Sequence, residues 1–179
     1  IYAQSNDGIW INLFAGSNTS ITMPKGNVDL KMETNYPWDG TVKISVGTIK
    51  KIKFNMHLRI PGYVNGIAAP GALYHFTDTA SAKPIIKING IAVSYTVEKG
   101  YAVINREWKK DDVVEMTIPM VIKKIIARDE LKQDNDRMAL QLGPLIYCFE
   151  GADNNGKAWN FIMPANADFK GENFKVKDE

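Results

Sequence analysis

Cysteine and histidine are scarce in this sequence: one of its 179 residues is a cysteine and two are histidines. A single cysteine, Cys148, excludes an internal disulfide framework and a zinc site built from clustered cysteines. His57 and His75 have no partner histidine nearby, so we expect both to be hydrogen-bonded surface residues rather than metal ligands. We therefore expect no metal or other cofactor bound within this chain.

Long apolar runs and an excess of one charge are also missing. No run of about 18 apolar residues is present, so we expect no membrane span. Lys and Arg number 22 against 20 for Asp and Glu, and a net charge of +2 argues against nucleic-acid binding. The sequence has no P-loop, dinucleotide-binding glycine pattern, His-Glu-x-x-His motif or Gly-x-Ser-x-Gly motif. We therefore expect neither nucleic acid nor membrane as a partner.

The two ends of the sequence look like cuts through a longer chain. The first residue is Ile1, with no signal-peptide pattern after it, and residues 170–179 are polar without a strand pattern. One cysteine is compatible with the cytoplasm and with the periplasm. The compartment is therefore open, and a periplasmic or extracellular one is slightly favoured.

Hydrophobic residues recur with a period of two along most of the sequence. From Ile52 to Leu58, every second residue is apolar and the residues between are polar. This alternation is typical of an antiparallel strand with one buried face and one solvated face. We predict an all-β fold, an antiparallel, jelly-roll-like β-sandwich with little helix. The expected strands are 9–14, 28–32, 42–46, 52–60, 85–88, 91–95, 101–104, 113–118, 121–126 and 138–149.

Turn sequences separate these strands. Asn89-Gly90 predicts a two-residue hairpin, and Lys99-Gly100 joins another pair of strands. In the segment Pro37 to Gly40, we expect the glycine to supply a positive φ. Residues 61–82 are rich in Gly, Ala and Pro, and we predict a surface loop there with a turn or short helix.

A polar segment, residues 127–136, precedes the last predicted strands and indicates a short helix or a linker. We therefore place a β-sandwich domain in residues 1–126. Residues 127–179 contain the final strands, for which two arrangements are open. They either complete the same sandwich or begin a second one that is only partly present in this sequence.

No set of residues predicts a catalytic centre. Cys148 lies in the apolar run Leu145–Phe149, where we expect a small buried hydrophobic side chain rather than a nucleophile. The two carboxylates of a glycosidase must face one cleft at a set separation. Nothing in the spacing of the carboxylates here indicates such a pair, so we assign no catalytic residue.

Five segments carry a resemblance to a known family. They are Trp10–Ser17, Glu33–Gly40, Leu58–Tyr63, Ile104–Asp112 and Met138–Gly151. In this order they resemble the C-terminal β-rich region of the β-L-arabinofuranosidase family, glycoside hydrolase family 127 and its relatives. The resemblance covers most of the chain, and the ordered set is more specific than any one segment.

The resemblance implies a bacterial glycoside hydrolase whose catalytic apparatus lies outside this chain. Enzymes of that family place their active site in an upstream (α/α)₆ barrel, where a cysteine nucleophile sits in a zinc-bound cysteine cluster with glutamates. Cys148 belongs to the β-region segment Gly143–Cys148 and does not match the nucleophile's motif. The resemblance therefore implies zinc only in the absent catalytic domain, and it implies that domain as a partner.

Four aromatic residues and one arginine are candidates for contact with carbohydrate or with another domain. A tight turn leaves Tyr36 and Trp38 exposed, as a ligand platform or as an anchor for another domain. Arg59, on the polar side of its strand, either pairs across a domain boundary or is solvated, and we weight the two equally. Tyr63 and Trp159 would add flat rings to a sugar site.

Three functions are compatible with these residues. The first is a non-catalytic accessory sandwich that packs on the upstream catalytic barrel. The second is a carbohydrate-binding module in which the exposed aromatic rings bind an oligosaccharide, by analogy with other sandwiches. The third is a free-standing interaction domain. We favour the first, because the family's nucleophile motif is missing from this sequence.

Overall fold

The computed structural model describes residues 1–78, 80, 82–158, 161–164 and 166–172. Strands dominate these residues, and the helices among them are short 3₁₀ turns, so the predicted all-β class is confirmed. The elements are β1 (Tyr2–Gln4), β2 (Gly8–Ile11), β3 (Ser17–Met23), β4 (Gly26–Thr34), β5 (Thr41–Thr48), β6 (Ile52–Arg59), η1 (Gly62–Asn65), β7 (Tyr74–Phe76), β8 (Ile85–Ile88), β9 (Ile91–Ala92), β10 (Thr96–Glu98), β11 (Tyr101–Trp108), β12 (Asp112–Thr117), β13 (Ile122–Ala127), η2 (Lys132–Asp134), β14 (Ala139–Leu142), β15 (Leu145–Tyr147) and η3 (Ala152–Asn154).

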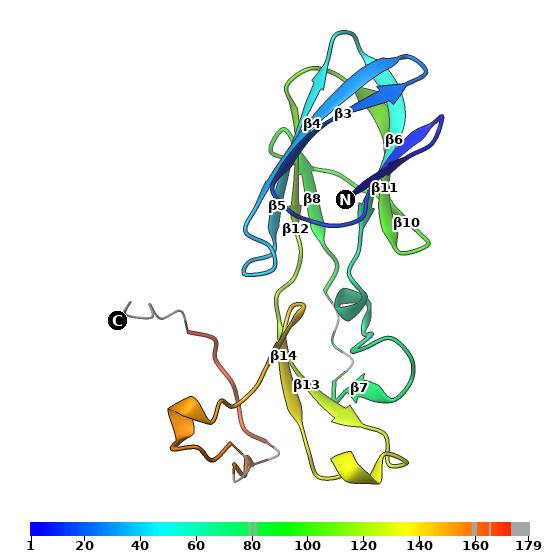
Figure 1. Cartoon of the computed structure of the whole chain (residues 1–179). Coiled ribbons are helices and arrows are strands. Elements are labelled where there is room, and N and C mark those ends of the chain that lie inside the picture. Colours follow the sequence, from blue (N-terminus) through cyan, green and yellow to red (C-terminus); the bar gives the residue numbers. More distant parts are fainter. Residues whose placement is uncertain (79, 81, 159–160, 165, 173–179) are drawn as a thin grey trace.

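Two sheets face each other to form a β-sandwich (Figure 1). Sheet A has the strand order β1-β2-β6-β11-β10, and sheet B has the order β3-β4-β5-β12-β8-β9. Neighbouring strands in the described part of the chain run antiparallel, except that β2 and β6 are parallel. The parallel pair places β2 inside sheet A, between β6 and the N-terminal edge strand β1.

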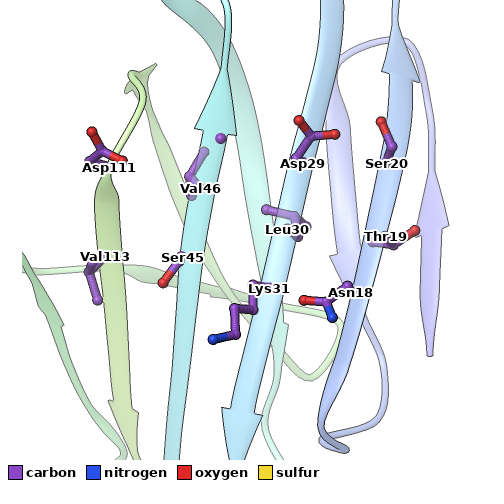
Figure 2. A pocket seen from close by; sticks show the side chains of 11 residues that line it. Asn18, Thr19, Ser20, Asp29, Leu30, Lys31, Ser45, Val46, Asp111 and Val113 are labelled. Atoms are coloured by element: carbon purple, nitrogen blue, oxygen red, sulfur yellow. The ribbon is translucent and has the colours of Figure 1, made fainter.

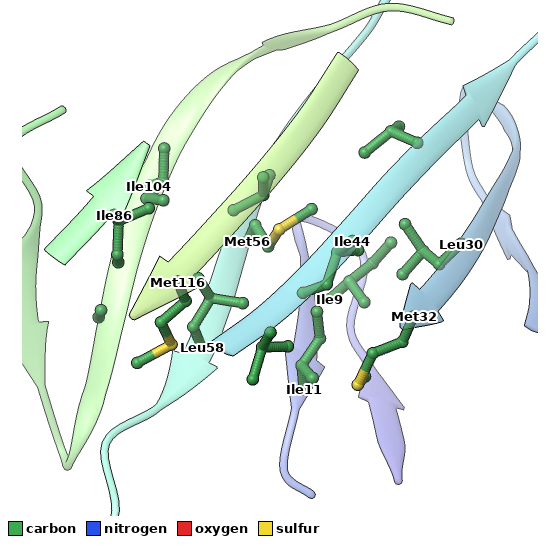
Figure 3. Packing of buried hydrophobic residues seen from close by; sticks show 14 of the residues in the cluster. Ile9, Ile11, Leu30, Met32, Ile44, Met56, Leu58, Ile86, Ile104 and Met116 are labelled. Carbon is green, nitrogen blue, oxygen red and sulfur yellow. The ribbon is translucent and has the colours of Figure 1, made fainter. Parts of the chain in front are cut away.

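The core lies between the inner faces of sheets A and B, where apolar side chains from both sheets meet (Figure 3). In β4, Val28, Leu30 and Met32 are buried while Asp29 and Lys31 between them are exposed. Fully burying one aliphatic side chain of this size contributes about 1.5–3 kcal/mol. The alternation read from the sequence therefore decides which residues point into the core and which point outward.

Trp108, at the end of β11, is the largest side chain in this core and is 0% exposed. Its ring stacks on Phe54, with 5.6 Å between the ring centroids. Its indole N–H donates a hydrogen bond of 3.1 Å to the Phe54 carbonyl. The one polar atom of this large side chain is therefore satisfied inside the core, as a buried indole requires.

A third sheet, sheet C, lies at one end of the sandwich and has the strand order β15-β14-β13-β7 (Figure 1). Strand β7 lies in the stretch 61–82, for which we predicted a surface loop. That stretch does contain the short helix η1, but the loop prediction was wrong for β7, which pairs with β13. Its three residues are too few to show a period, and its partner is distant in sequence. Sheet C thus contains strands from both sides of residues 126–127.

The hairpin prediction at Asn89-Gly90 is confirmed, because the two residues have φ angles of 52° and 81° and join β8 to β9. The prediction for Gly40 was wrong, since its φ is not positive. A Cβ at Gly40 would lie 1.9 Å from the carbonyl oxygen of Ile118. Gly40 is therefore needed for close approach of two backbones at the end of sheet B, not for an unusual φ.

Cys148 was predicted to be buried and is exposed. It directly follows β15, the edge strand of sheet C, and Ile146 and Tyr147 in that strand are exposed too. An apolar run normally indicates burial, but an edge strand has a neighbour on one side only. Position in the sheet, rather than composition, therefore decides the environment of this cysteine.

A buried carboxylate joins the end of β11 to the β8–β9 hairpin. The Asp112 side chain is 0% exposed. It accepts hydrogen bonds from the Asn89 amide at 2.9 Å and from the Lys109 backbone N–H at 3.0 Å, and its Oδ2 lies 3.5 Å from Arg106. Burial raises the pKa of the Asp112 carboxyl, but these hydrogen bonds and cationic groups outweigh burial, and the net pKa is lowered.

The pKa of Asp112 is lower in the folded state than in the unfolded state, where it is about 4. Ionised Asp112 therefore stabilises the fold at pH values above roughly 4, and this contribution is lost as the pH falls through the folded-state pKa. We predict that Asp112→Asn lowers the free energy of unfolding by about 1–3 kcal/mol at pH 7, because a buried donor is left facing another donor. The difference between variant and wild type should shrink below about pH 4. Urea denaturation between pH 3 and pH 7 checks this.

The neighbouring Asp111 provides the matched control for this experiment. It is exposed and has a left-handed φ of 67°, which asparagine tolerates, so Asp111→Asn should be nearly neutral. An equal loss of stability in both variants, or a difference that does not depend on pH, would contradict the role given to Asp112.

Candidate interdomain surfaces

The candidate contact residues from the sequence do not share one surface. Tyr36 and Tyr63 come together near sheet C. Trp38 stands apart on the turn between β4 and β5, with 75% of its surface exposed. Arg59 is exposed at the end of β6 in sheet A. Trp159 lies outside the described residues.

The tyrosine pair forms the junction between the sandwich and sheet C. Tyr36 packs edge-on against Phe14, with 5.7 Å between the ring centroids, and is half-buried rather than exposed. The Tyr63 hydroxyl lies 3.6 Å from the Met120 sulfur, to which it donates a weak hydrogen bond. Burial raises the pKa of both phenols, and the hydrogen bond with Tyr36 raises the pKa of Tyr63 further. Both phenols therefore remain neutral at physiological pH.

Met120 fits in this junction because two neighbouring residues, Gly40 and Gly143, have no side chain. A Cβ at Gly40 would lie 3.1 Å from its Cγ, and a Cβ at Gly143 would lie 2.3 Å from its sulfur. Gly143 opens the turn between β14 and β15, so the contact links the sandwich to sheet C. Two of the predicted contact residues, Tyr36 and Tyr63, therefore surround a contact inside this chain.

A second group of side chains covers the outer face of sheet A. Trp10 stacks on His57, with 4.0 Å between the ring centroids and an interplanar angle of 6°. His57 in turn meets Tyr101 edge-on at 6.4 Å, and the Arg59 guanidinium lies 5.5 Å from the Tyr101 ring centroid. The Tyr101 hydroxyl is 2.8 Å from the Asn12 side-chain oxygen, to which it donates. We call these five residues the aromatic patch.

Strand register brings the aromatic patch together. Trp10 on β2 is directly opposite His57 on β6, and Arg59 is directly opposite Tyr101 on β11. These four residues occupy the outward-facing positions of their strands, and the alternate positions point into the core. Of the five, we had singled out only Arg59 as a contact residue. An aromatic residue in the polar phase, such as Trp10, is the signal that would have found the others.

His57 was expected to be a hydrogen-bonded surface residue, and that expectation was wrong. The residue is only 8% exposed, and its contacts are the rings on either side of it. Burial lowers the pKa of His57, while the charges of Glu98 and Asp7 raise it to a smaller extent. The imidazole is therefore neutral at pH 7 and acts as a flat packing element.

The outer face of sheet B has a different character. It carries a hollow of about 650 Å³ over β3, β4, β5 and β12, shown in Figure 2. Its lining includes hydroxyl, amide and charged side chains together with Leu30, Val46 and Val113, and it has no aromatic ring. Farther along the sheet, Glu33, Lys43, Glu115 and Lys87 sit opposite one another in adjacent strands with alternating charge. This arrangement is typical of a solvated sheet face.

Neither face gathers a reactive set of side chains. Within the described residues, no group of three or more His, Cys, Asp or Glu side chains is placed to hold a metal ion. No helix in the same part of the chain is long and apolar enough to cross a bilayer.

Comparison with protein families identifies the chain. Residues 8–120 match the model of the middle domain of the family 127 β-L-arabinofuranosidases, and residues 122–176 match the model of the family 127 C-terminal domain. The chain belongs to glycoside hydrolase family 127. The resemblance read from the sequence is thereby confirmed.

The similar proteins are much longer than this chain. It is 30% identical over 143 residues to a non-reducing end β-L-arabinofuranosidase of Bifidobacterium longum subsp. longum, covering 75% of this chain and 18% of that protein. A solved β-L-arabinofuranosidase from Geobacillus stearothermophilus T6 is 32% identical with a TM-score of 0.79, covering 94% of this chain and 24% of that one. Another solved family 127 β-arabinofuranosidase is 36% identical, again with a TM-score of 0.79, over 85% of this chain and 24% of that one. The chain therefore spans about a quarter or less of the relatives it matches.

The two family 127 regions are interlocked in this structure. The boundary between the matched regions falls next to Met120, in the junction described above. Strand β7 belongs to the middle region by sequence, but it pairs with β13 of the C-terminal region. A shared sheet and a packed junction therefore connect the two regions, in addition to the chain itself.

The aromatic patch depends on Gly8, because a Cβ at this position would lie 2.9 Å from the His57 Nε2 and 3.2 Å from the Asn55 carbonyl oxygen. We predict that Gly8→Ala lowers the free energy of unfolding by about 1–3 kcal/mol and displaces His57 from Trp10. Urea denaturation, together with near-ultraviolet circular dichroism of the aromatic rings, measures both effects.

Gly16→Ala is the matched control, because the nearest atom to a Cβ at Gly16 is the Met32 carbonyl oxygen at 4.0 Å. This variant should change neither the stability nor the aromatic signal to a comparable degree. If Gly8→Ala were as well tolerated as Gly16→Ala, the patch would not be packed as described.

Proposed function

We propose that this chain is a non-catalytic accessory β-module of a family 127 glycoside hydrolase, and that it packs against an (α/α)₆ catalytic barrel in the same polypeptide. The observation that carries the proposal is the combination of family membership with the absence of a reactive cluster among the described residues. The relatives are named for β-L-arabinofuranosidase activity, and the polypeptide containing this module is proposed to share that activity.

The donor set of this chain does not fit the zinc site implied for the catalytic barrel. Such a site needs about four nitrogen, sulfur or carboxylate ligands that converge on one point. Cys148 is exposed beside sheet C, while His57 is enclosed between two rings of sheet A. These side chains lie on different elements and do not converge on one point. Zinc chemistry is accordingly assigned to the barrel.

Asp112 is not suited to serve as one of the two carboxylates of a glycosidase either. Its side chain is fully buried, and its oxygens are bound by Asn89, Lys109 and Arg106. A general acid in a glycosidase needs a raised pKa, whereas the pKa of Asp112 is lowered. The carboxylate with the most elaborate environment is therefore held ionised for structural reasons.

Carbohydrate binding receives less support than packing. A sugar platform needs open ring faces that are directed toward one surface. Tyr36 and Tyr63 are half-buried against each other, and Trp38 stands alone on its turn. The described aromatic candidates therefore do not combine into one binding surface. A free-standing function is less supported as well, because every matched relative named above is several times longer.

We predict that this chain alone does not hydrolyse β-L-arabinofuranosides above the buffer rate, whereas the longer polypeptide that contains it does. The reason is that the nucleophile and the zinc ligands are proposed to lie in the barrel. Release of arabinose from a chromogenic β-L-arabinofuranoside at matched molar concentrations measures the difference. Turnover by the isolated chain would overturn the proposal.

A second measurement separates support from chemistry. Asp112→Asn, introduced into the longer polypeptide, should lower its melting temperature, while kcat and KM below that temperature stay near the wild-type values. A module that takes part in the chemistry would instead change kcat or KM without affecting stability.

A further inference from the structure

We propose that the aromatic patch on the outer face of sheet A is the surface that binds the catalytic part of the family 127 polypeptide. This inference rests on the proposed function and adds the location of the contact. The patch is Trp10, Asn12, His57, Arg59 and Tyr101, and the occupant is a protein surface on the same polypeptide.

The two outer faces of the sandwich differ in the way that interface and solvent surfaces differ. The face of sheet A holds tryptophan, tyrosine and arginine near the end of β6, and these residue types are enriched where proteins bind each other tightly. The face of sheet B holds alternating lysines and glutamates and a hollow without aromatic rings. Lysine and glutamate are depleted from interface centres. Sheet A is therefore the face suited to docking.

The surroundings of the patch complete this pattern. On β6 the outward position next to His57 is Asn55, while on β11 Val103 lies between Tyr101 and Asn105. Asn55 and Asn105 hydrogen bond to each other, and Lys53 and Glu107 follow. These polar side chains border the aromatic patch on one side, as the polar rim of an interface borders its core. The patch thus has both the centre and the border of a protein contact.

The patch is pre-arranged, which favours a protein partner over a sugar. One face of the Trp10 indole is covered by His57, and the Tyr101 ring is covered by the Arg59 guanidinium. Rings whose faces are covered by neighbouring side chains offer less area for stacking on a sugar. They hold their rotamers without help from a ligand, and this reduces the entropy lost on docking. Arg59 remains exposed and needs a carboxylate or carbonyl acceptor on the partner.

The length of the relatives argues for the occupant. In the solved relatives, the region that matches this chain makes up 24% of the polypeptide. About three quarters of such a chain therefore lies elsewhere, and domain contacts within one chain commonly bury about 600–1,500 Å². The inner face of sheet A is filled by the core, and the Met120 junction is filled by sheet C. Among the described residues, the outer face of sheet A remains available for such a contact, as does the aromatic surface of Tyr147, Phe149 and Phe161 beside sheet C. The aromatic patch is favoured because it includes the exposed Arg59 and the polar border described above.

Oxidative footprinting compares this chain alone with the longer polypeptide that contains it. Trp10 should be oxidised several-fold more slowly in the longer polypeptide, because its remaining exposed edge is covered there. Trp38, on the sheet B side and 75% exposed, is the internal control and should react equally in both. Mass spectrometry of the two tryptophan-containing peptides gives both rates in one experiment.

Two variants of the longer polypeptide sharpen the test. Arg59→Ala should raise the oxidation rate of Trp10 toward that of the isolated chain, whereas Lys43→Ala on the outer face of sheet B should leave it unchanged. Circular dichroism of the isolated chain with Arg59→Ala checks that the sandwich still folds.

The outcomes separate this inference from the proposed function. Protection of Trp38 or of the sheet B face, with Trp10 equally reactive in both proteins, would overturn the inference and leave the accessory role in place. Equal reactivity of every described side chain in both proteins would overturn the inference and the proposed packing role together.

Discussion

The packing of sheet A on sheet B is the interaction on which the rest of the structure depends. Side chains alternate across a strand, so the residues that fill the core also decide which residues face outward. With Ile9 and Ile11 buried, Trp10 must lie on the outer face, where the register of β2 and β6 places it on His57. A shift of one residue would exchange these faces and remove both the core and the aromatic patch.

Close backbone approaches set the second constraint. Gly8 allows the imidazole of His57 to lie against β2, and Gly40 lets the end of sheet B close on Ile118. Gly143 leaves room for Met120 between the sandwich and sheet C. Each glycine is needed because a side chain would meet atoms that the fold has already placed, and the contact of Gly143 with Met120 joins the C-terminal region to the middle region.

These features together favour a supporting role. Two of the buried polar groups, the Asp112 carboxylate and the Trp108 indole, are bound by structural partners, whereas Thr48 Oγ1 and Gln141 Oε1 are buried without a hydrogen-bond partner. The residues proposed to contact the catalytic part lie on the outside of sheet A. A stable slab with one aromatic outer face and one charged outer face has a preferred side for docking, and that asymmetry is what an accessory module needs.

Some features of this protein follow from the local sequence pattern, and others depend on tertiary contacts. The period of two and the turn at Asn89-Gly90 determined most of the long strands, the sandwich and the outward phase of Arg59, because these depend on neighbouring residues alone. The strands β1, β3 and β10 were not predicted. Sheet C was not predictable, since β7 is three residues long and pairs with β13, which lies far along the chain. The burial of His57 and the exposure of Cys148 were likewise decided by the tertiary structure, because burial depends on which strands are neighbours and which strand lies at an edge. Sequence alternation says which way a side chain points, and only strand order says what it meets there.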